Sequence, residues 1–152
     1  MKPPILATGA YQDLVPGDKH AFGSYRLDSA EIKEFAARWD PMPVHVDEAA
    51  AKASLFGGLT ACGTHLLAIR VHLIQAHGVN PYVIASLGYE VKFLKPARSG
   101  DLLTLYVECA SKRESKSRPG TGIVQLSCTL NNQADETVLS MMDTLMIKKS
   151  GK

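Results

Sequence analysis

An acid and an imidazole lie five residues apart in a segment that two prolines stiffen. Residues 39–47 read WDPMPVHVD, and Asp40 and His45 are the pair of interest. A stiff backbone can hold both side chains toward one point with little entropy left to lose, as proton transfer requires. The alternative is that Asp40 caps a turn and that His45 is an ordinary surface or partly buried residue. Because Asp–Pro turns are common, the spacing alone favours this alternative.

A second candidate stretch lies at residues 56–64, which read FGGLTACGT. A glycine-rich approach to a helix leaves backbone N–H groups free at the positive end of the helix dipole, where a carbonyl oxygen or a phosphate can bind. The alternative is that the glycines only permit a tight turn between two helices. Taken alone, the stretch favours the tight turn.

Other polar residues are weaker candidates. His65 and His72 are seven residues apart and could share a helix face, but there is neither an HExxH pattern nor a carboxylate at ligand spacing, so no metal site is predicted. Arg70 lies in an apolar helical pattern and must find a partner or a surface, and we expect a structural ion pair. The basic run at 112–118 could steer a phosphate-bearing ligand, although a solvated hairpin is the simpler interpretation.

Helical signals precede the Asp40–His45 segment. Residues 20–27 alternate briefly and could form a first strand. A capping box follows, in which Asp28 accepts from the first-turn amides and Glu31 reaches back, so a short amphipathic helix should end near Trp39. The residue before a proline is pushed out of the α region, which predicts an extended connector over 40–44.

Two further helices are predicted after this connector. Asp47 is a good N-cap for a short helix over 48–53. A longer helix should run from Gly63 to Gly78. The glycine at 78 suits the left-handed position that follows the end of a helix. A helix that is apolar nearly all round is either a membrane span or a buried central helix, and this one is too short to span. Its apolar residues are Leu66, Leu67, Ile69, Val71, Leu73 and Ile74.

The second half of the chain has the two-residue period of strands. The alternating runs occupy residues 84–93, 103–109, 124–130 and 138–147, separated by turn residues at 96–101, 115–122 and 131–136. Consecutive strands with short connections favour an antiparallel sheet. One long buried helix before such a sheet, and wrapped by it, predicts the α+β class.

Composition is that of an ordinary globular domain. The chain has 152 residues, of which 45% are hydrophobic and 21% charged, and we expect one domain over 1–152. A net charge of +2, with basic residues spread along the chain, argues against a nucleic-acid partner. The most apolar helical stretch, 66–76, is interrupted by Arg70 and His72, so no membrane span is predicted. The N-terminal apolar run is too short for a secretory signal.

Cysteine usage points to a reducing compartment. The three cysteines, Cys62, Cys109 and Cys128, are odd in number, widely spaced and without a CxxC pair. They therefore predict neither a zinc site nor a disulfide framework. Two of them fall in apolar alternating runs, where cysteine behaves as a small hydrophobe. We expect a cytoplasmic protein.

These motifs together resemble the MaoC-like acyl dehydratases, the family of the (R)-specific enoyl-CoA hydratases. The family's signature is D-x-N-P-x-H-x-D followed by F-G-x-x-I-A-H-G. Here residues 40–47 read DPMPVHVD and residues 56–63 read FGGLTACG, and KPARSGD at 95–101 precedes a strand. The resemblance runs from about Leu14 to Lys148, which is nearly the whole chain.

The resemblance implies a hot-dog fold, an antiparallel sheet of five or six strands wrapped around one long central helix. It implies that Asp40 and His45 are catalytic and activate one water, while the Gly63 N–H polarises the carbonyl of a trans-2-enoyl thioester. The substrate itself carries CoA or an acyl-carrier phosphopantetheine, so no separate cofactor is expected. Dimers in this family join two sheets edge to edge, which predicts a homodimer or a multiple of dimers. The implied substrate-binding residues are Phe56, Gly58, Cys62, Gly63 and Thr64.

The chain departs from the family's signature at two positions. The asparagine two residues after the aspartate is Met42 here, which removes one polar contact behind the site. The histidine before the glycine is Cys62. The acid–base pair survives both changes, and we expect them to bear on substrate choice and on catalytic efficiency.

Two other functions compete with hydration. A hot-dog thioesterase usually places a carboxylate on the central helix, and residues 63–78 contain no Asp or Glu. A binding module for acyl-CoA or an acyl carrier that has lost turnover is the other alternative, supported only by Met42. A turnover assay separates this module from a hydratase.

Overall fold

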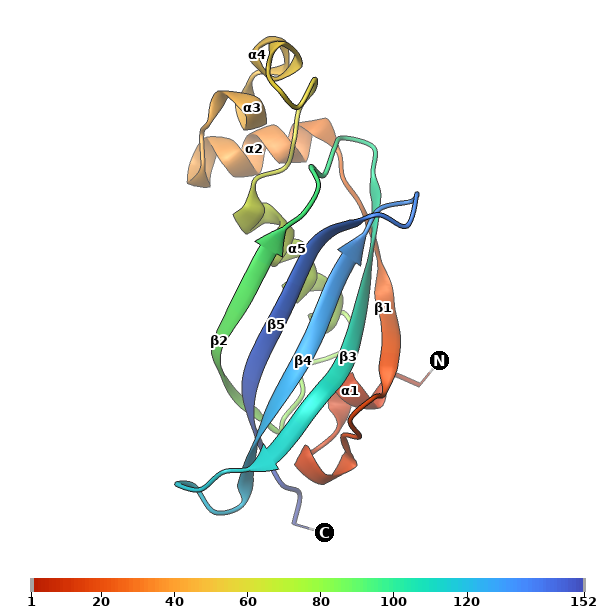
Figure 1. Cartoon of the computed structure of the whole chain (residues 1–152), viewed down its shortest axis with the longest axis vertical. Coiled ribbons are helices and arrows are strands. Elements are labelled where there is room, and N and C mark those ends of the chain that lie inside the picture. Colours follow the sequence, from red (N-terminus) through yellow and green to blue (C-terminus); the bar gives the residue numbers. More distant parts are fainter. Residues whose placement is uncertain (1, 152) are drawn as a thin grey trace.

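The computed structural model describes residues 2–151. Over this range the chain forms five strands, one long helix against one face of their sheet, and short helices that gather at one end (Figure 1). The turns α1 (Ile5–Thr8) and η1 (Tyr11–Asp13), which the sequence patterns do not predict, lie toward the other end. The domain predicted over 1–152 includes Met1 and Lys152, which are outside the described residues. No helix within the described range has the length and apolarity to cross a membrane.

The helix α2 (Ser29–Trp39) begins where the sequence predicts. The Asp28 carboxylate accepts a hydrogen bond from the Glu31 amide at 3.0 Å. The reciprocal half of the predicted capping box is wrong. The Glu31 carboxylate accepts a hydrogen bond from the Tyr25 hydroxyl at 2.7 Å and lies 3.1 Å from His65 Nε2. Partners that are distant in the sequence thus take the place of the local amide, and they join α2 to the long helix.

The prolines predicted an extended connector over 40–44, but the segment is extended only in part. It leads into one helical turn, α3 (Pro43–Val46), because Pro43 takes the first helical position, where its missing N–H is not needed. The next helix, α4 (Glu48–Ala53), begins as predicted. The Asp47 carboxylate accepts hydrogen bonds from two first-turn amides at 3.0 and 3.1 Å.

The long helix α5 (Gly63–Gln75) starts at the predicted glycine and ends three residues before Gly78. Gly78 still has the left-handed φ of 99° in the turn that follows. The prediction that α5 is buried holds for the face toward the sheet. On the other face Val71 is 47% exposed, because one sheet covers only one side of a helix.

The sheet has the order β1-β3-β4-β5-β2 within the described residues, and all pairs are antiparallel. The predicted α+β class is therefore confirmed. β2 pairs with β5 and not with β3, so the connection 94–101 crosses the end of the sheet (Figure 1). The strands are β1 (Lys19–Arg26), β2 (Val83–Phe93), β3 (Leu102–Glu114), β4 (Thr121–Asn131) and β5 (Thr137–Lys148).

The core lies between α5 and the inner face of the sheet. Alternate residues of β3, β4 and β5 are buried there, as the two-residue period predicts. The strand β2 is the exception, since none of its residues is fully buried. Leu87 and Tyr89 are each 53% exposed, which leaves an apolar strand uncovered at the edge of the sheet.

A buried ion pair joins α5 to the sheet, as predicted for Arg70. Arg70 Nη2 donates to Asp143 Oδ2 of β5 at 2.6 Å, and both side chains are more than nine-tenths buried. Ser86 of β2 donates its hydroxyl to Asp143 Oδ1 at 2.7 Å. Both oxygens of the buried carboxylate are thus hydrogen-bonded, which is what keeps a buried charge tolerable.

Asp143→Ala should lower the free energy of unfolding by about 3–5 kcal/mol, because it leaves Arg70 as an uncompensated buried charge. The double variant Arg70→Met with Asp143→Leu should lower the free energy of unfolding far less. Apolar residues of similar size remove the desolvation penalty of both charges. Urea denaturation followed by circular dichroism measures both. If the free energy of unfolding of Asp143→Ala lay within about 1 kcal/mol of the wild-type value, this account of the pair would be contradicted.

The hydrogen bond to Glu31, helped by burial, raises the pKa of Tyr25 to about 12 from its ordinary value of 10.0. A pKa that is higher in the folded than in the unfolded state means that neutral Tyr25 stabilises the fold below pH 10. This stabilisation is lost as the pH rises toward 12. The gap in unfolding free energy between the wild type and Tyr25→Phe should therefore narrow over this window. A gap that stays constant to pH 12 would show that Glu31 does not control the phenol.

Candidate active site

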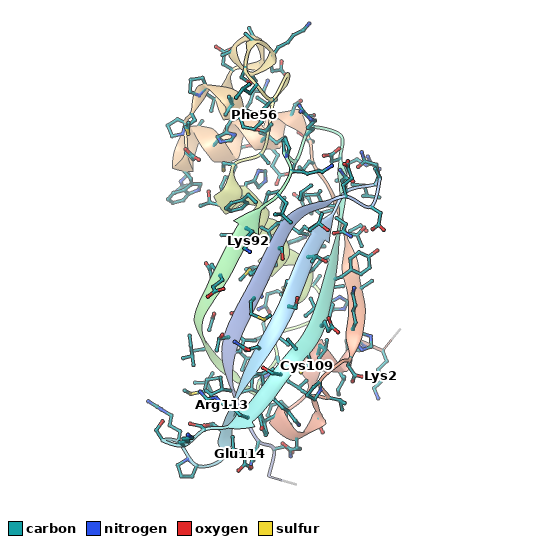
Figure 2. All side chains as sticks on the ribbon, viewed as in Figure 1. Lys2, Phe56, Lys92, Cys109, Arg113 and Glu114 are labelled. Atoms are coloured by element: carbon teal, nitrogen blue, oxygen red, sulfur yellow. The ribbon has the colours of Figure 1, made fainter. Side chains whose placement is uncertain are left out.

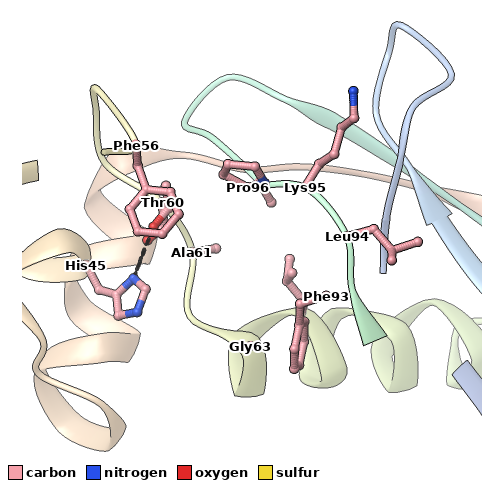
Figure 3. Close-up of a pocket in the computed structure, with 11 residues that line it drawn as sticks. His45, Phe56, Thr60, Ala61, Gly63, Phe93, Leu94, Lys95 and Pro96 are labelled. Atoms are coloured by element: carbon pink, nitrogen blue, oxygen red, sulfur yellow. Dashed lines mark hydrogen bonds between the residues drawn. The ribbon is translucent and has the colours of Figure 1, made fainter. Parts of the chain in front are cut away.

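His45 is held by a backbone carbonyl from another segment. Its ring, on α3, places Nδ1 2.7 Å from the carbonyl oxygen of Thr60 (Figure 3). A carbonyl can only accept, so Nδ1 carries the proton in this hydrogen bond. In the neutral ring the lone pair is then on Nε2. The ring is therefore set up to accept a proton at Nε2.

Asp40 faces this nitrogen. It caps the end of α2, where its amide donates to the Ala36 carbonyl at 2.8 Å, and its Oδ2 lies 3.8 Å from His45 Nε2. This separation is too long for a direct hydrogen bond and has the length at which a water can bridge two polar groups. The carboxylate is also close enough to stabilise a protonated imidazole by charge.

The segment that carries the Thr60 carbonyl is fixed on both sides. The Thr60 amide donates to the Val44 carbonyl at 3.2 Å, and the Ala61 amide donates to the Ala97 carbonyl at 2.9 Å. The approach to α5 is thus tied both to α3 and to the connection that crosses the sheet. These bonds fix the position of the acceptor for His45.

The start of α5 fits closely against β2. As the first residue of the helix, Gly63 has an amide without an intrahelical acceptor, and no acceptor for it is found among residues 2–151. A Cβ on Gly63 would lie 2.6 Å from the ring of Phe93. Only a glycine allows this ring to lie where it does against the helix start.

A pocket of about 360 Å³ opens beside these groups. His45 and Phe56 lie on one side of it, and Phe93 lies on the other, beside the start of α5 at Gly63 (Figure 3). Its wall is mainly apolar, and its one lysine, Lys95, pairs with Glu136. The lining residues are His45, Phe56, Thr60, Ala61, Gly63, Leu66, Phe93, Leu94, Lys95, Pro96 and Ala97.

The structure brings some of the predicted site residues together and not others. Asp40 approaches His45 without lining the pocket, while Phe56 and Gly63 line it. The other three predicted contacts, Gly58, Cys62 and Thr64, are not among the lining residues. The Cys62 side chain is fully buried with its Sγ 3.3 Å from Thr64 Oγ1, and Thr64 is exposed.

Sequence reasoning missed three parts of the site. They are the Thr60 carbonyl, Phe93 at the end of β2, and the connection after it, 94–97. The KPARSGD motif was a signal for the last of these. Nothing in the sequence shows that it folds across the start of α5.

The remaining candidates lie apart from this pocket. His65 stacks on Phe35 with 4.5 Å between ring centroids, and its buried Nδ1 has no hydrogen-bond partner in the described part of the chain. Within residues 2–151 no three His, Cys, Asp or Glu side chains converge as a metal site requires. The basic run 112–118 forms the β3–β4 hairpin at the opposite end of the sheet, where Arg113 and Glu114 are labelled in Figure 2.

A protein family model and a known protein match most of this chain. The family model described as MaoC like domain matches residues 13–132. Protein MaoC of Klebsiella aerogenes is 31% identical over 110 residues, which are 71% of this chain. The matched region is 32% of that protein, so the chain spans about a third of the length of this relative.

Solved structures agree with this match. A MaoC-like dehydratase from Rhodospirillum rubrum is 34% identical with a TM-score of 0.86, over 94% of this chain and 99% of that one. The R-hydratase PhaJ1 from Pseudomonas aeruginosa is 26% identical with a TM-score of 0.75, over 93% of this chain and 86% of that one. RV0216 of Mycobacterium tuberculosis, described as a double hotdog fold, is 19% identical and shares the fold at a TM-score of 0.81, over 97% of this chain and 46% of that one. The chain belongs to the MaoC like domain family and has the hot-dog fold that the sequence motifs implied.

Proposed function

We propose that this chain hydrates trans-2-enoyl thioesters to 3-hydroxyacyl thioesters and catalyses the reverse dehydration. The observation that supports this most is the placement of His45 at the pocket, with Nδ1 on the Thr60 carbonyl at 2.7 Å and Nε2 3.8 Å from Asp40. The R-hydratase similarity adds to it. The thioester carries its own CoA or phosphopantetheine arm, and no cofactor of the protein enters the reaction.

The acid–base step follows from the hydrogen bonds of His45. A water held between Nε2 and the Asp40 carboxylate loses a proton to Nε2 as its oxygen bonds to C3 of the enoyl group. The ring becomes an imidazolium, which the Asp40 carboxylate stabilises by charge. The imidazolium then returns a proton to C2, so that one water has been added and His45 is neutral again.

The electron pair displaced from the double bond passes to the thioester oxygen. The Gly63 N–H, free at the positive end of α5, is the donor for this oxygen. Because Gly63 has no side chain, the ring of Phe93 can lie against the helix start, where both residues line the pocket proposed for the thioester. Losing such a donor costs about 10²–10³-fold in rate in other enzymes.

Asp40→Asn and His45→Ala should each lower the rate of crotonyl-CoA hydration by about 10²–10⁴-fold. The double variant should be scarcely slower than either single one, because groups that act as a unit are not additive. Loss of the absorbance of the conjugated thioester measures the rate, and thermal melting checks folding. His72→Ala, on the exposed side of α5, is the matched control. Turnover like that of the wild type in a folded single variant would favour the acyl-binding module.

Met42→Asn restores the residue of the family's signature and should leave hydration intact or raise it. Met42 is 56% exposed and stands at the N-cap of α3, where its side chain makes no capping hydrogen bond. An asparagine there can cap the turn, which is worth about 0.5–2 kcal/mol. The variant should therefore also melt at a higher temperature. A large loss of activity would mean that Met42 itself contacts the substrate.

A homodimer formed through β2 completes the proposal. The strand has an unpaired edge and leaves large apolar side chains exposed, which a second copy related by a two-fold axis would cover. Phe93 at its end also lines the pocket, so the same strand would serve both the interface and the site. The exposed apolar side chains of β2 are Val83, Ile84, Leu87, Tyr89 and Phe93.

Light scattering at micromolar concentration should give twice the mass of the chain. The double variant Ile84→Lys with Leu87→Lys should shift the measured mass toward that of one chain. In the dimer, the lysines of the two copies would meet at the paired edges and repel each other. Thr129→Lys, in the interior strand β4, is the control and should stay dimeric. A wild type with the mass of one chain would refute this assembly.

A further inference from the structure

A second pocket, of about 200 Å³, lies farther along α5. Its wall is mainly apolar, and its polar lining residues are Gln75, Asn80 and the buried ion pair of Arg70 and Asp143. Residues from β2 and β5 form the opposite side, among them Val83 and Leu145. An apolar pocket with a few fixed polar groups is the usual form of a small-molecule site, in which the polar groups decide which ligand binds.

Arg70 has more hydrogen-bond donors than its neighbours use. One of its five N–H groups goes to Asp143, and the Cys128 thiol is its other polar neighbour. Its Nε is buried and has no hydrogen-bond partner among residues 2–151. Asp143 already accepts from Arg70 and from Ser86, so its charge is offset. Arg70, which lines the second pocket, thus has more N–H donors than its bond to Asp143 uses.

The two pockets lie one after the other along α5. Gly63 and Leu66 line the first pocket and Arg70 and Ile74 line the second. Their spacings of three, four and four residues put them on one face of the helix. The rise of α5 places Arg70 about 10 Å beyond Gly63 along the axis. The strand β2 runs beside both pockets, with Phe93 at the first and Val83 at the second.

We propose that Arg70, with Asp143, selects an acyl chain that carries a neutral oxygen, a hydroxyl or a carbonyl, near its far end. This rests on the proposed function, because the thioester carbonyl must lie at Gly63 for the chain to run along α5 to Arg70. A chain of about eight carbons covers the 10 Å between them. A carboxylate fits less well than a neutral oxygen, since Asp143 already offsets the arginine and a second anion would be buried without a partner.

Three substrates test the proposal on the wild-type protein. Crotonyl-CoA is too short to reach Arg70 and reports the proposed function alone. trans-2-Octenoyl-CoA and its 8-hydroxy derivative differ only in the terminal oxygen. The kcat/KM for the hydroxylated chain should exceed that for the plain chain about tenfold or more, because a hydrogen bond to a charged group is gained and a buried donor is satisfied.

The variant Arg70→Met with Asp143→Leu should lose this preference or reverse it. Lys149→Met with Glu114→Leu removes an ion pair remote from both pockets and should leave all three rates unchanged. If the double variant does not fold, the wild-type ratio alone decides the matter. Equal rates for the two octenoyl chains, with crotonyl-CoA hydrated, would overturn the role of Arg70 and leave the proposed function standing. A preference that persists in a folded Arg70–Asp143 variant would also overturn it. If none of the three substrates were hydrated, both the role of Arg70 and the proposed function would be refuted.

Discussion

The arrangement of this fold depends on the burial of α5, a helix with apolar side chains around most of its circumference. The curled sheet covers one side of it, and the alternating residues of β3, β4 and β5 supply the complementary surface. Arg70, the charged residue on the buried face, could be accepted there only with Asp143 beside it. The side that the sheet does not reach keeps Val71 half exposed next to the open strand β2.

The candidate site forms where this helix begins. Asp40 comes from the end of α2, His45 from α3, and Phe93 from the last position of β2. The hydrogen bonds of Glu31 to Tyr25 and His65 hold α2 against α5, so that the end of α2 has a defined place relative to Gly63. Segments far apart in the chain are thus positioned by polar contacts made inside or at the edge of the core.

The sequence predicted those features of the fold that depend only on residues close together in the chain. Asp28 and Asp47 start their helices because a side-chain oxygen meets the next free amides, and strand alternation follows from the pleat. The turn at Pro43 was misjudged because a proline favours the first position of a helix as well as an extended chain. That Arg70 needs a partner was predictable, whereas the identity of Asp143 depends on where α5 packs against β5. The partner of His45 was equally hidden, since it is a peptide group with no residue type to recognise.

The Thr60 carbonyl has a consequence for how this site can change over evolutionary time. Every residue type has a main-chain oxygen, so no single substitution at position 60 deletes the acceptor that orients the imidazole. Side chains around it can vary in size and polarity while the tautomer of His45 stays the same. The part of the site that governs proton transfer is therefore inherited with the path of the backbone, and the part that chooses the substrate is free to diverge.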